Sequence, residues 1–320
     1  AAKVEMLKQG ISPIYEPGLE ELIKEGLKNG RLRFTTDLAQ VLPDVRIVFS
    51  AVATPPDEGY KADLRAVFKV AETVAEHATK DVIFVNKSTV PVGTGAKCQE
   101  KIDAILERRE LDIRIPVISN PEFLREGMAV SDTMMPERVV VGMNGHDWAV
   151  DEVEELYRPI TRVGKPLVFM GRESAEIVKY AANSFLATKI SFINMLTEMC
   201  EKTGANIRDV AQGIGLDSRI GSRFLHAGIG YGGSCFPKDV KALLATAKEL
   251  GIDLPIVEAT DAINQKQRKR FINTMLATLK PNSTVAVWGL SFKPKTDDMR
   301  DAPSLDIIPA LINAGHSVVA

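Results

Sequence analysis

The sequence contains few residues that could cross-link the fold. Its 320 residues include only three cysteines, Cys98, Cys200 and Cys235, which lie far apart. An odd and sparse set of cysteines argues against a disulfide framework and is typical of a reducing cytosol. The four histidines are scattered, and the cysteines lack the spacing of metal ligands. We therefore expect a cytoplasmic protein without disulfides and without a bound metal.

Long hydrophobic runs and an excess of one charge are also missing. No stretch of about 18 apolar residues occurs, and the first residues do not form a signal peptide, so the sequence predicts no membrane span. The formal net charge of −2 gives no case for nucleic acid or an acidic membrane as a partner. A local basic run at residues 266–270 falls within a predicted helix, and we interpret it as a solvated helix face.

The sequence further lacks a G-x-G-x-x-G turn. A dinucleotide-binding domain normally opens with a strand, this turn, and an acidic residue about 20 positions later. Here the sequence opens on a short helical pattern at residues 2–9 and ends within a strand pattern at residues 315–320. We expect that both ends of the natural protein are missing from it.

What the sequence does contain is an alternation of strand and helix patterns in its first half. Continuous apolar runs predict buried strands at residues 46–52, 81–86, 115–118 and 138–142, and these alternate with helical patterns. Such an order predicts a parallel sheet covered on both faces. Ligands bind beyond the carboxyl ends of parallel strands, and the sequence has Thr54, Ser88, Thr89 and Glu122 at these positions.

The second half changes character twice. Residues 174–267 are almost entirely helical in pattern, whereas we interpret residues 283–293 as a new buried strand that runs into a glycine turn. A helix at residues 304–314 and a strand from residue 315 follow. The fold class is therefore α/β, with three predicted domains: a parallel-sheet domain (1–167), an all-helical central domain (168–282) and the start of a second α/β domain (283–320).

One cysteine stands between a glycine-rich turn and a helix. Cys235 follows Gly232 and Gly233, and Pro237 suits the first turn of the helix that begins there. The helix N-terminus and the adjacent Lys238 both favour a thiolate. Cys235 is therefore either an activated nucleophile or a small buried side chain packed beside a tight turn.

Three polar pairs recur at the i,i+4 spacing that places two side chains on one helix face. The pairs are Glu122 with Glu126, Lys179 with Asn183, and Cys235 with Asp239. Each pair alone is compatible with an ordinary surface contact. The helix around Lys179 leaves little polar face, however, and a buried lysine requires a compensating partner.

Four motifs in order resemble a known family. Residues 87–93, 120–127, 230–239 and 292–300 resemble the nucleotide-sugar 6-dehydrogenases of the UDP-glucose/GDP-mannose dehydrogenase family, and the resemblance extends over essentially the whole chain. It implies a Rossmann-like NAD-binding domain, a helical central domain and a second Rossmann-like domain for the nucleotide sugar. Residues 126–127 and 228–236 are more similar to the members that oxidise UDP-glucose than to those that oxidise GDP-mannose.

The resemblance implies a four-electron oxidation of the sugar C6 alcohol to a carboxylate, with two NAD⁺ consumed in turn. Cys235 would form a thiohemiacetal with the aldehyde and then a thioester. Lys179 and Asn183 would stabilise oxyanions at C6, which suits a charged donor and an amide. Asp239 and Thr89 would order or activate water, and Glu122 is a candidate base for hydrolysis of the thioester.

The same resemblance implies two sets of binding residues. NAD would contact Thr54, Pro55, Ser88, Thr89, Glu126, Lys238 and Arg300. Besides the catalytic side chains Glu122, Lys179 and Asn183, the nucleotide sugar would contact Phe123, Leu124, Tyr231, Gly232, Gly233, Phe292 and Lys293, together with Arg219, which would reach into a neighbouring subunit's site. Without the resemblance, Phe292 reads as a core aromatic at the end of a strand. A homodimer through the helical domain is also implied.

Several alternatives stay open. A polypeptide of only these residues, without the glycine fingerprint, would bind NAD weakly, and it would then be a non-catalytic remnant that binds a nucleotide sugar. The substrate could be GDP-mannose or a UDP-N-acetylhexosamine in place of UDP-glucose. A cysteine hydrolase would need a histidine to activate the thiol, and His226 is the only histidine near Cys235 in the sequence.

Overall fold

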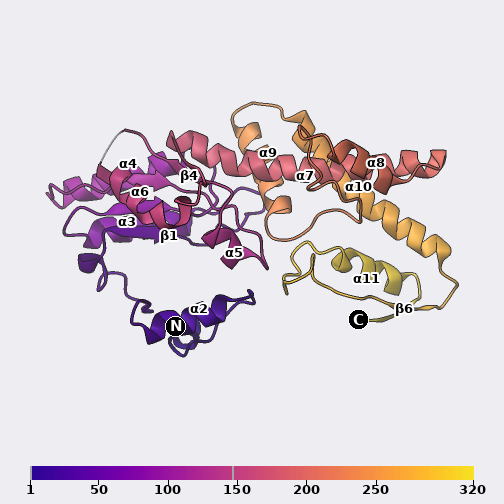
Figure 1. Ribbon diagram of the computed structural model, residues 1–320, viewed down its shortest axis with the longest axis horizontal. Helices are drawn as coiled ribbons and strands as arrows, with labels where there is room; N and C mark the ends of the chain where they lie inside the picture. Colours follow the sequence, from indigo (N-terminus) through magenta and orange to yellow (C-terminus); the bar gives the residue numbers. More distant parts are fainter. Residues whose placement is uncertain (1, 146–147) are drawn as a thin grey trace. The chain divides into compact units, whose positions relative to one another are not determined.

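A computed structural model describes residues 2–145 and 148–320, which form two compact units, Ala1–Lys179 and Tyr180–Ala320. The first unit contains, in chain order, α1 (Ala2–Lys8), α2 (Leu19–Lys28), η1 (Leu42–Asp44), β1 (Ile47–Ser50), α3 (Arg65–His77), β2 (Ile83–Asn86), α4 (Thr94–Arg108), β3 (Val117–Ser119), α5 (Ala129–Met134), β4 (Val139–Gly142), α6 (Trp148–Thr161) and β5 (Leu167–Met170) (Figure 1).

The long helix α7 (Arg172–Thr203) begins in the first unit and ends in the second. The second unit continues with α8 (Ile207–Gly215), α9 (Phe236–Glu249), α10 (Pro255–Thr278), β6 (Thr284–Ala286), α11 (Ser304–Asn313) and β7 (Ser317–Val319). The three-domain division of the sequence stays a prediction. Among the described residues, no helix combines the length and the apolar character needed to cross a membrane.

The first unit is built on a five-stranded sheet in the order β1-β2-β3-β4-β5. Its α/β, Rossmann-like class confirms the prediction, although β3 and β4 pair antiparallel through Ser119 and Gly142 while the other neighbours are parallel. A parallel pair needs a long crossover, usually a helix that packs on the sheet. The segment between β3 and β4 contains only the six-residue helix α5. Neither this reversal nor β5 was predicted from the sequence.

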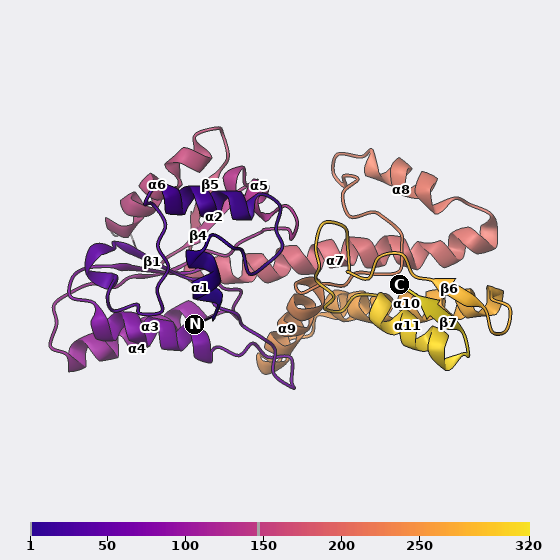
Figure 2. The same ribbon diagram turned by 90° about the horizontal axis from the view of Figure 1, so that it is seen from below.

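Strand β2 shows why apolar residues follow one another without alternation in the predicted strands. Phe84 belongs to a core with α3 and α4 on one face of the sheet, which includes Val67 and Ile102. Ile83 and Val85 belong to a core on the other face with α6, which includes Val153. Figure 2 shows α3 and α4 side by side. Because both faces are covered, every position of the strand is buried.

The second unit surrounds a smaller core. Ala187 of α7, Tyr231 and Val240 of α9 are buried together, with Val257 of α10 packed against them. Strand β6 pairs in parallel with β7, which packs against α11. Strand β6 and the positive φ of 91° at Gly289 agree with the strand and glycine turn predicted within residues 283–293. The predicted burial of this strand is wrong, because Thr284 and Ala286 are exposed and Val285 is half-buried.

Helix α10 also corrects the interpretation of the basic run. Thr260, Asn264 and Arg268 are buried at successive i,i+4 positions and form the inner face of this helix. The run at residues 266–270 is thus not simply a solvated face. Arg268 is only 8% exposed, whereas Lys266 is exposed and pairs with Glu198.

The first turn of α7 packs very closely on β4 at Gly142. A Cβ atom at Gly142 would lie 2.4 Å from the Cβ of Ala175 and 3.0 Å from the Cα of Arg172. We expect Gly142→Ala to destabilise the protein by about 1–3 kcal/mol, since backbone must move to admit the methyl group. Thermal unfolding measured by calorimetry checks this.

Gly213 of α8 provides the control for Gly142. It has no atom within 4 Å of an added Cβ, so Gly213→Ala should stabilise the helix by up to about 1 kcal/mol. Equal unfolding temperatures for the two variants would contradict the close contact at Gly142.

Candidate active site

The loops after β1 and β2 meet at one edge of the sheet, as predicted. The Thr54 hydroxyl donates to the Thr89 carbonyl oxygen at 2.8 Å, and the Ser88 hydroxyl donates to the Val52 carbonyl at 2.7 Å. Thr54 is buried, and Ser88 and Thr89 are half-buried. Pro55 is exposed next to Thr54. The hydroxyls therefore tie the two loops together at the edge where parallel sheets bind ligands.

Lys179 is paired with Glu122 within the first unit. The lysine is 3% exposed, and its ammonium donates to the Glu122 carbonyl oxygen at 2.7 Å and to Oε1 at 2.9 Å. This carboxylate is the partner that a buried lysine requires. The predicted pairing of Glu122 with Glu126 on one helix face is wrong, because residues 120–125 form an irregular loop in which Glu122 turns toward α7.

The loop that carries Glu122 is held at several other points. The Glu122 Oε2 atom accepts from the Leu124 backbone N–H at 2.6 Å. The ring of Phe123 lies 3.7 Å from the Arg138 guanidinium and 5.6 Å from the Lys179 ammonium. Glu126 is half-buried.

The end of this loop is fixed by a residue far away in the sequence. Glu16, which belongs to the segment between α1 and α2, accepts from the Gly127 and Ala129 N–H groups at 2.7 and 2.8 Å. The Glu16 carboxylate thereby caps the start of α5. The loop from Glu122 to Ala129 is therefore anchored at both of its ends.

Glu176 is a structural support that sequence reasoning missed. Its buried carboxylate accepts from the backbone N–H groups of Gly93 (2.7 Å) and Gly95 (2.8 Å), at the start of α4, and from the Ser119 hydroxyl (3.0 Å). Burial raises its pKa above the usual value for glutamate. Since Glu176 precedes Lys179 by three residues on α7, it fixes the rotation of the helix that presents Lys179 to Glu122.

A small cavity brings several predicted residues together. Its volume is about 10 Å³, close to the minimum for one water molecule. The residues that line it include Ser88, Thr89, Glu176 and Lys179. The predicted water-ordering Thr89 and the predicted oxyanion donor Lys179 therefore face one space.

Lys87, Asn120 and Tyr157 form a second group that was not predicted. The Asn120 Oδ1 atom accepts from the Lys87 ammonium at 3.1 Å and from the Tyr157 hydroxyl at 2.5 Å. The pKa of Lys87 is lowered to about 8, chiefly by burial; the Glu122 carboxylate opposes this shift and the charge of Lys179 contributes to it. Burial raises the pKa of Tyr157 to about 12. Lys87 and Asn120 begin two of the motifs that resemble the family, but no pattern in the sequence indicated that they meet Tyr157.

In the second unit, Cys235 occupies the N-cap of α9, as the sequence predicts. Its carbonyl accepts from the Asp239 N–H at 2.8 Å, and its side chain is half-buried, whereas Cys98 and Cys200 are buried. The Asp239 carboxylate, 1% exposed, accepts from Asn183 Nδ2 and from Lys238 Nζ, each at 2.6 Å. Lys238 therefore forms an ion pair with Asp239, four residues after Cys235.

The glycines before Cys235 permit close approach to the segment at residues 292–301. A Cβ atom at Gly232 would lie 2.2 Å from the Asp301 carbonyl oxygen, and one at Gly233 would lie 2.6 Å from the ring of Phe292. Gly233 also has a positive φ of 85°. Burial of Tyr231 raises the pKa of its hydroxyl. Phe292 thus packs on residues 230–234, which we call the glycine loop.

The remaining predicted residues of the second unit lie nearer the surface. The Lys293 ammonium lies 5.3 Å from the centre of the Phe292 ring. Arg219 and Arg300 are exposed and bind Asp217 and Asp298 through closest contacts of 2.5 and 2.7 Å. Both arginines are thus available at the surface with their side chains held by a nearby carboxylate.

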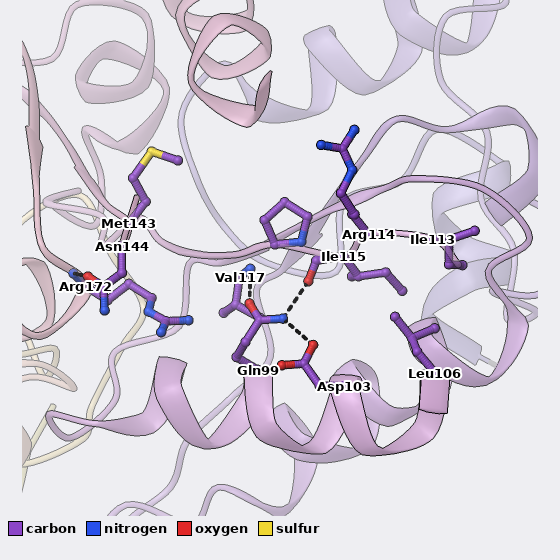
Figure 3. Close-up of a pocket in the computed structure, with 11 residues that line it drawn as sticks. Gln99, Asp103, Leu106, Ile113, Arg114, Ile115, Val117, Met143, Asn144 and Arg172 are labelled. Carbon is purple, nitrogen blue, oxygen red and sulfur yellow. Dashed lines mark hydrogen bonds between the residues drawn. The ribbon is translucent and has the colours of Figure 1, made fainter. Parts of the chain in front are cut away.

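A larger cavity lies away from all of these residues. It has a volume of about 370 Å³ and is lined by residues of α4, of the segment entering β3, of the segment after β4, and by Arg172 (Figure 3). The Gln99 amide accepts from the Val117 N–H at 2.8 Å and donates to the Ile115 carbonyl at 3.1 Å. The Gln99 side chain thus binds backbone groups on both sides of Pro116 in the wall of this cavity. No cluster of acidic, histidine or cysteine side chains suited to a metal occurs in the described part of the chain.

Comparison with known proteins gives consistent matches along the chain. The models of the UDP-glucose/GDP-mannose dehydrogenase family match with the NAD binding domain at residues 1–161, the central domain at 173–266 and the UDP binding domain at 286–320. A UDP-glucose 6-dehydrogenase of Pseudomonas aeruginosa is 47% identical over 99% of this chain and 71% of its own length.

Two solved structures extend this comparison. A UDP-glucose dehydrogenase of Pyrobaculum islandicum is 35% identical with a TM-score of 0.90. A GDP-mannose dehydrogenase of Pseudomonas aeruginosa is 30% identical with a TM-score of 0.64. Each match covers 99% of this chain and 73% of the solved one. Both the sequence identity and the structural similarity are thus higher for the UDP-glucose enzyme.

The charged form of Lys87 should be costly for folding. A lysine in the unfolded chain has a pKa of about 10.4, whereas Lys87 in the folded protein has a pKa of about 8. Between these two pH values the unfolded state binds more protons than the folded state, so the free energy of unfolding increases with pH. The destabilisation present at pH 7 is therefore lost as the pH rises from about 8 to 10.4. We expect Lys87→Met to raise the free energy of unfolding at pH 7 by about 1–3 kcal/mol. Unfolding at pH 7 and pH 10 measures how far this gain shrinks.

Lys97→Met is the matched control for Lys87→Met, since Lys97 is an exposed lysine of α4. It should leave stability within about 0.5 kcal/mol at both pH values. If Lys87→Met were destabilising to the same extent at pH 7 and pH 10, Lys87 would be a structural hydrogen-bond donor and not a strained cation.

Proposed function

The chain belongs to the UDP-glucose/GDP-mannose dehydrogenase family, and we propose that it oxidises UDP-glucose at C6 to UDP-glucuronate. The membership confirms the predicted oxidoreductase class and NAD as its cofactor. The observation that carries the choice of sugar is the higher identity to UDP-glucose enzymes than to the GDP-mannose enzyme. GDP-mannose and UDP-N-acetylhexosamines are the competing substrates.

The loops after β1 and β2 fit a dinucleotide, since their hydroxyl groups stand at the carboxyl edge of parallel strands. We propose Thr54, Pro55, Ser88, Thr89, Glu126, Lys238 and Arg300 as the residues that hold NAD. Bound there, NAD⁺ supplies the hydride acceptor for both oxidations. The balanced reaction converts UDP-glucose, two NAD⁺ and water into UDP-glucuronate, two NADH and three protons.

Cys235 is the proposed nucleophile. Its thiolate adds to the C6 aldehyde and gives a hemithioacetal oxyanion, which loses hydride to become a thioester. Water then attacks the thioester carbonyl, and the C–S bond breaks to release the carboxylate and the thiol. The position of Cys235 at the N-cap of α9 supports this role, because a helix N-terminus favours the thiolate.

Lys179 and Asn183 are the proposed oxyanion donors, four residues apart on α7. Hydrogen bonds to Glu122 account for two of the three N–H groups of Lys179 among the described residues, and Asp239 accepts from the Asn183 amide, which has a second N–H. Each side chain therefore retains a donor for the developing charge. Glu122, Asp239 and Thr89 are the proposed groups that activate or order water for hydrolysis.

The remaining residues are proposed to bind the nucleotide sugar. Phe123 and Leu124 adjoin Glu122 in its loop, while Tyr231, Gly232 and Gly233 precede Cys235. Phe292 and Lys293 would hold the uridine end, and Arg219 would reach a neighbouring subunit's site. The contact of Phe292 with Gly233 supports this, since it joins the proposed uridine site to the loop of the nucleophile.

An exposed apolar stripe on α7 supports a homodimer. Phe185, Phe192, Met195 and Met199 of the second unit are each 45–66% exposed and recur at intervals of seven, three and four residues. Such spacing forms one continuous face of a helix, and contiguous exposed apolar surface commonly marks a protein interface. We also propose a cytoplasmic location, which the three free cysteines support.

The stoichiometry of NADH formation tests the function. Wild-type protein with UDP-glucose and NAD⁺ should form two NADH, measured at 340 nm, for each UDP-glucose consumed. Cys235→Ser should lower the rate of UDP-glucuronate formation on the order of 10³-fold or more, because a serine hydroxyl is a weaker nucleophile than a thiolate.

Cys200→Ala controls for the loss of a thiol elsewhere on the chain. It should retain the wild-type stoichiometry. Unchanged UDP-glucuronate formation by Cys235→Ser would remove the cysteine from the mechanism. A faster reaction with GDP-mannose or a UDP-N-acetylhexosamine would replace the proposed substrate.

Sedimentation velocity tests the dimer. Phe192→Glu places a charge within the α7 stripe and should weaken association by at least about a hundredfold, because burying an unpaired carboxylate is costly. Met134→Glu, at an exposed methionine of α5, is the control and should leave the mass unchanged. A dimer that persists in Phe192→Glu at low micromolar concentration would exclude the stripe as the interface.

A further inference from the structure

Arg268 links two separate segments of the second unit. Its Nη2 atom donates to the carbonyl oxygens of Tyr231 and Asp301, both at 2.6 Å, and its Nη1 atom donates to the Asp306 carboxylate at 2.8 Å. Tyr231 belongs to the glycine loop that leads into Cys235. Asp301 is the last residue of the segment at residues 292–301. One guanidinium therefore contacts both segments and the first turns of α11.

Asn264 holds the same loop one helical turn earlier on α10. Its side-chain amide accepts from the Tyr231 N–H at 2.8 Å and donates to the Tyr231 carbonyl at 3.1 Å. A Cβ atom at Gly230 would lie 2.5 Å from the Asn264 Oδ1 atom. The backbone at Tyr231 is thus fixed by two buried side chains from one face of α10.

The glycine loop is in direct contact with the segment at residues 292–301. The Gly233 N–H donates to the Arg300 carbonyl at 2.8 Å, and Gly232 adjoins the Asp301 carbonyl and the Arg268 Nη2 atom. Any movement of residues 292–301 must therefore change the environment of the loop. Arg268 bonds to the backbone of both and transmits such a movement directly.

Joining two segments through a buried arginine has a free-energy cost. Desolvation of its charge is costly, and well-packed apolar groups often give equal stability. The planar guanidinium, however, offers several donors in a fixed geometry that a lysine ammonium does not reproduce. The three acceptors of Arg268 use this geometry, so the residue specifies how the two segments are arranged.

We propose that Arg268 is a positioning residue that makes the position of the Cys235 loop depend on residues 292–301. This inference rests on the proposed function for one element, the assignment of Phe292, Lys293 and Arg300 to the nucleotide. With that assignment, a bound uridine diphosphate orders residues 292–301, and Arg268 transfers this order to Tyr231 and the loop of the nucleophile. Cys235 then takes the position needed to attack the C6 aldehyde only when the nucleotide is bound.

Alkylation of Cys235 by iodoacetamide reports the loop position without turnover. Cys98 and Cys200 are buried, and peptide mass spectrometry identifies the modified residue. In the absence of nucleotide, Arg268→Met should raise the alkylation rate constant of Cys235 about tenfold, as expected for the loss of hydrogen bonds to a charged group. Arg268→Lys, which keeps the charge, should raise the alkylation rate constant of Cys235 by a smaller factor. This variant replaces Arg268→Met in the test if the methionine variant does not fold.

UDP provides the second measurement. In wild-type protein, saturating UDP should slow alkylation about fivefold or more, a typical coupling between two sites. In both Arg268 variants this protection should be lost although calorimetry still detects UDP binding. Direct shielding of the thiol by UDP would persist in the variants, and that result would overturn the proposal.

Arg270→Met is the matched control on the same helix. Arg270 lies two residues further along α10 and pairs with Glu201 and Thr197, away from the loop. It should leave the alkylation rate and the UDP effect unchanged. If UDP does not bind to the wild-type protein, the proposed function is wrong at this site, whereas the alkylation rates without nucleotide still decide whether Arg268 holds the loop.

Discussion

Buried polar side chains on helix α7 need hydrogen-bond partners, and this need constrains the segments that carry the candidate residues. Glu176, Lys179 and Asn183 are each at most 7% exposed, and each finds its partner in a different segment. Glu176 binds the start of α4, Lys179 binds the Glu122 loop, and Asn183 binds Asp239 of α9. A buried donor or acceptor without a partner costs about 1–3 kcal/mol, so within each unit these contacts limit where the bound segment can lie against α7.

Close backbone contact plays the corresponding role around Cys235. A side chain at Gly232 or Gly233 would clash with the Asp301 carbonyl or the Phe292 ring. Two polar side chains of α10, Asn264 and Arg268, bind the backbone of the same loop at Tyr231. Cys235, the proposed nucleophile, thus lies at a helix N-terminus, and the loop that leads to it is held by hydrogen bonds to its backbone. Such support from a second layer is what keeps a reactive group in productive geometry.

Features set by local pattern could be predicted from the sequence. The strands β1, β2 and β4, the position of Cys235 before a helix and the α7 spacing of Lys179 and Asn183 all follow from periodicity and turn residues. The assumed helical pairing of Glu122 with Glu126 failed, because the real partner of Glu122 is 57 residues away. Local spacing contains no information about such a contact.

Arg268 was misinterpreted for a related reason. A basic run is usually a solvated face, and only the burial of one side of α10 by the glycine loop distinguishes Arg268 from its neighbours. Lys87, Asn120 and Tyr157 were missed because their group forms only when three elements of the sheet come together. In both cases the property belongs to the tertiary environment and not to the residue.

The capping of α5 by Glu16 has a consequence for the order of assembly. The contact joins residues 111 positions apart, so the chain must close a long loop before the contact contributes any stability. The pairing of β1 with β2 and the packing of α3 on α4 require far shorter loops. Because contacts at low sequence separation cost less loop-closure entropy, we infer that the segment around Glu16 joins a core that has already formed. The loop from Glu122 to Ala129 would then acquire its final anchor late in folding.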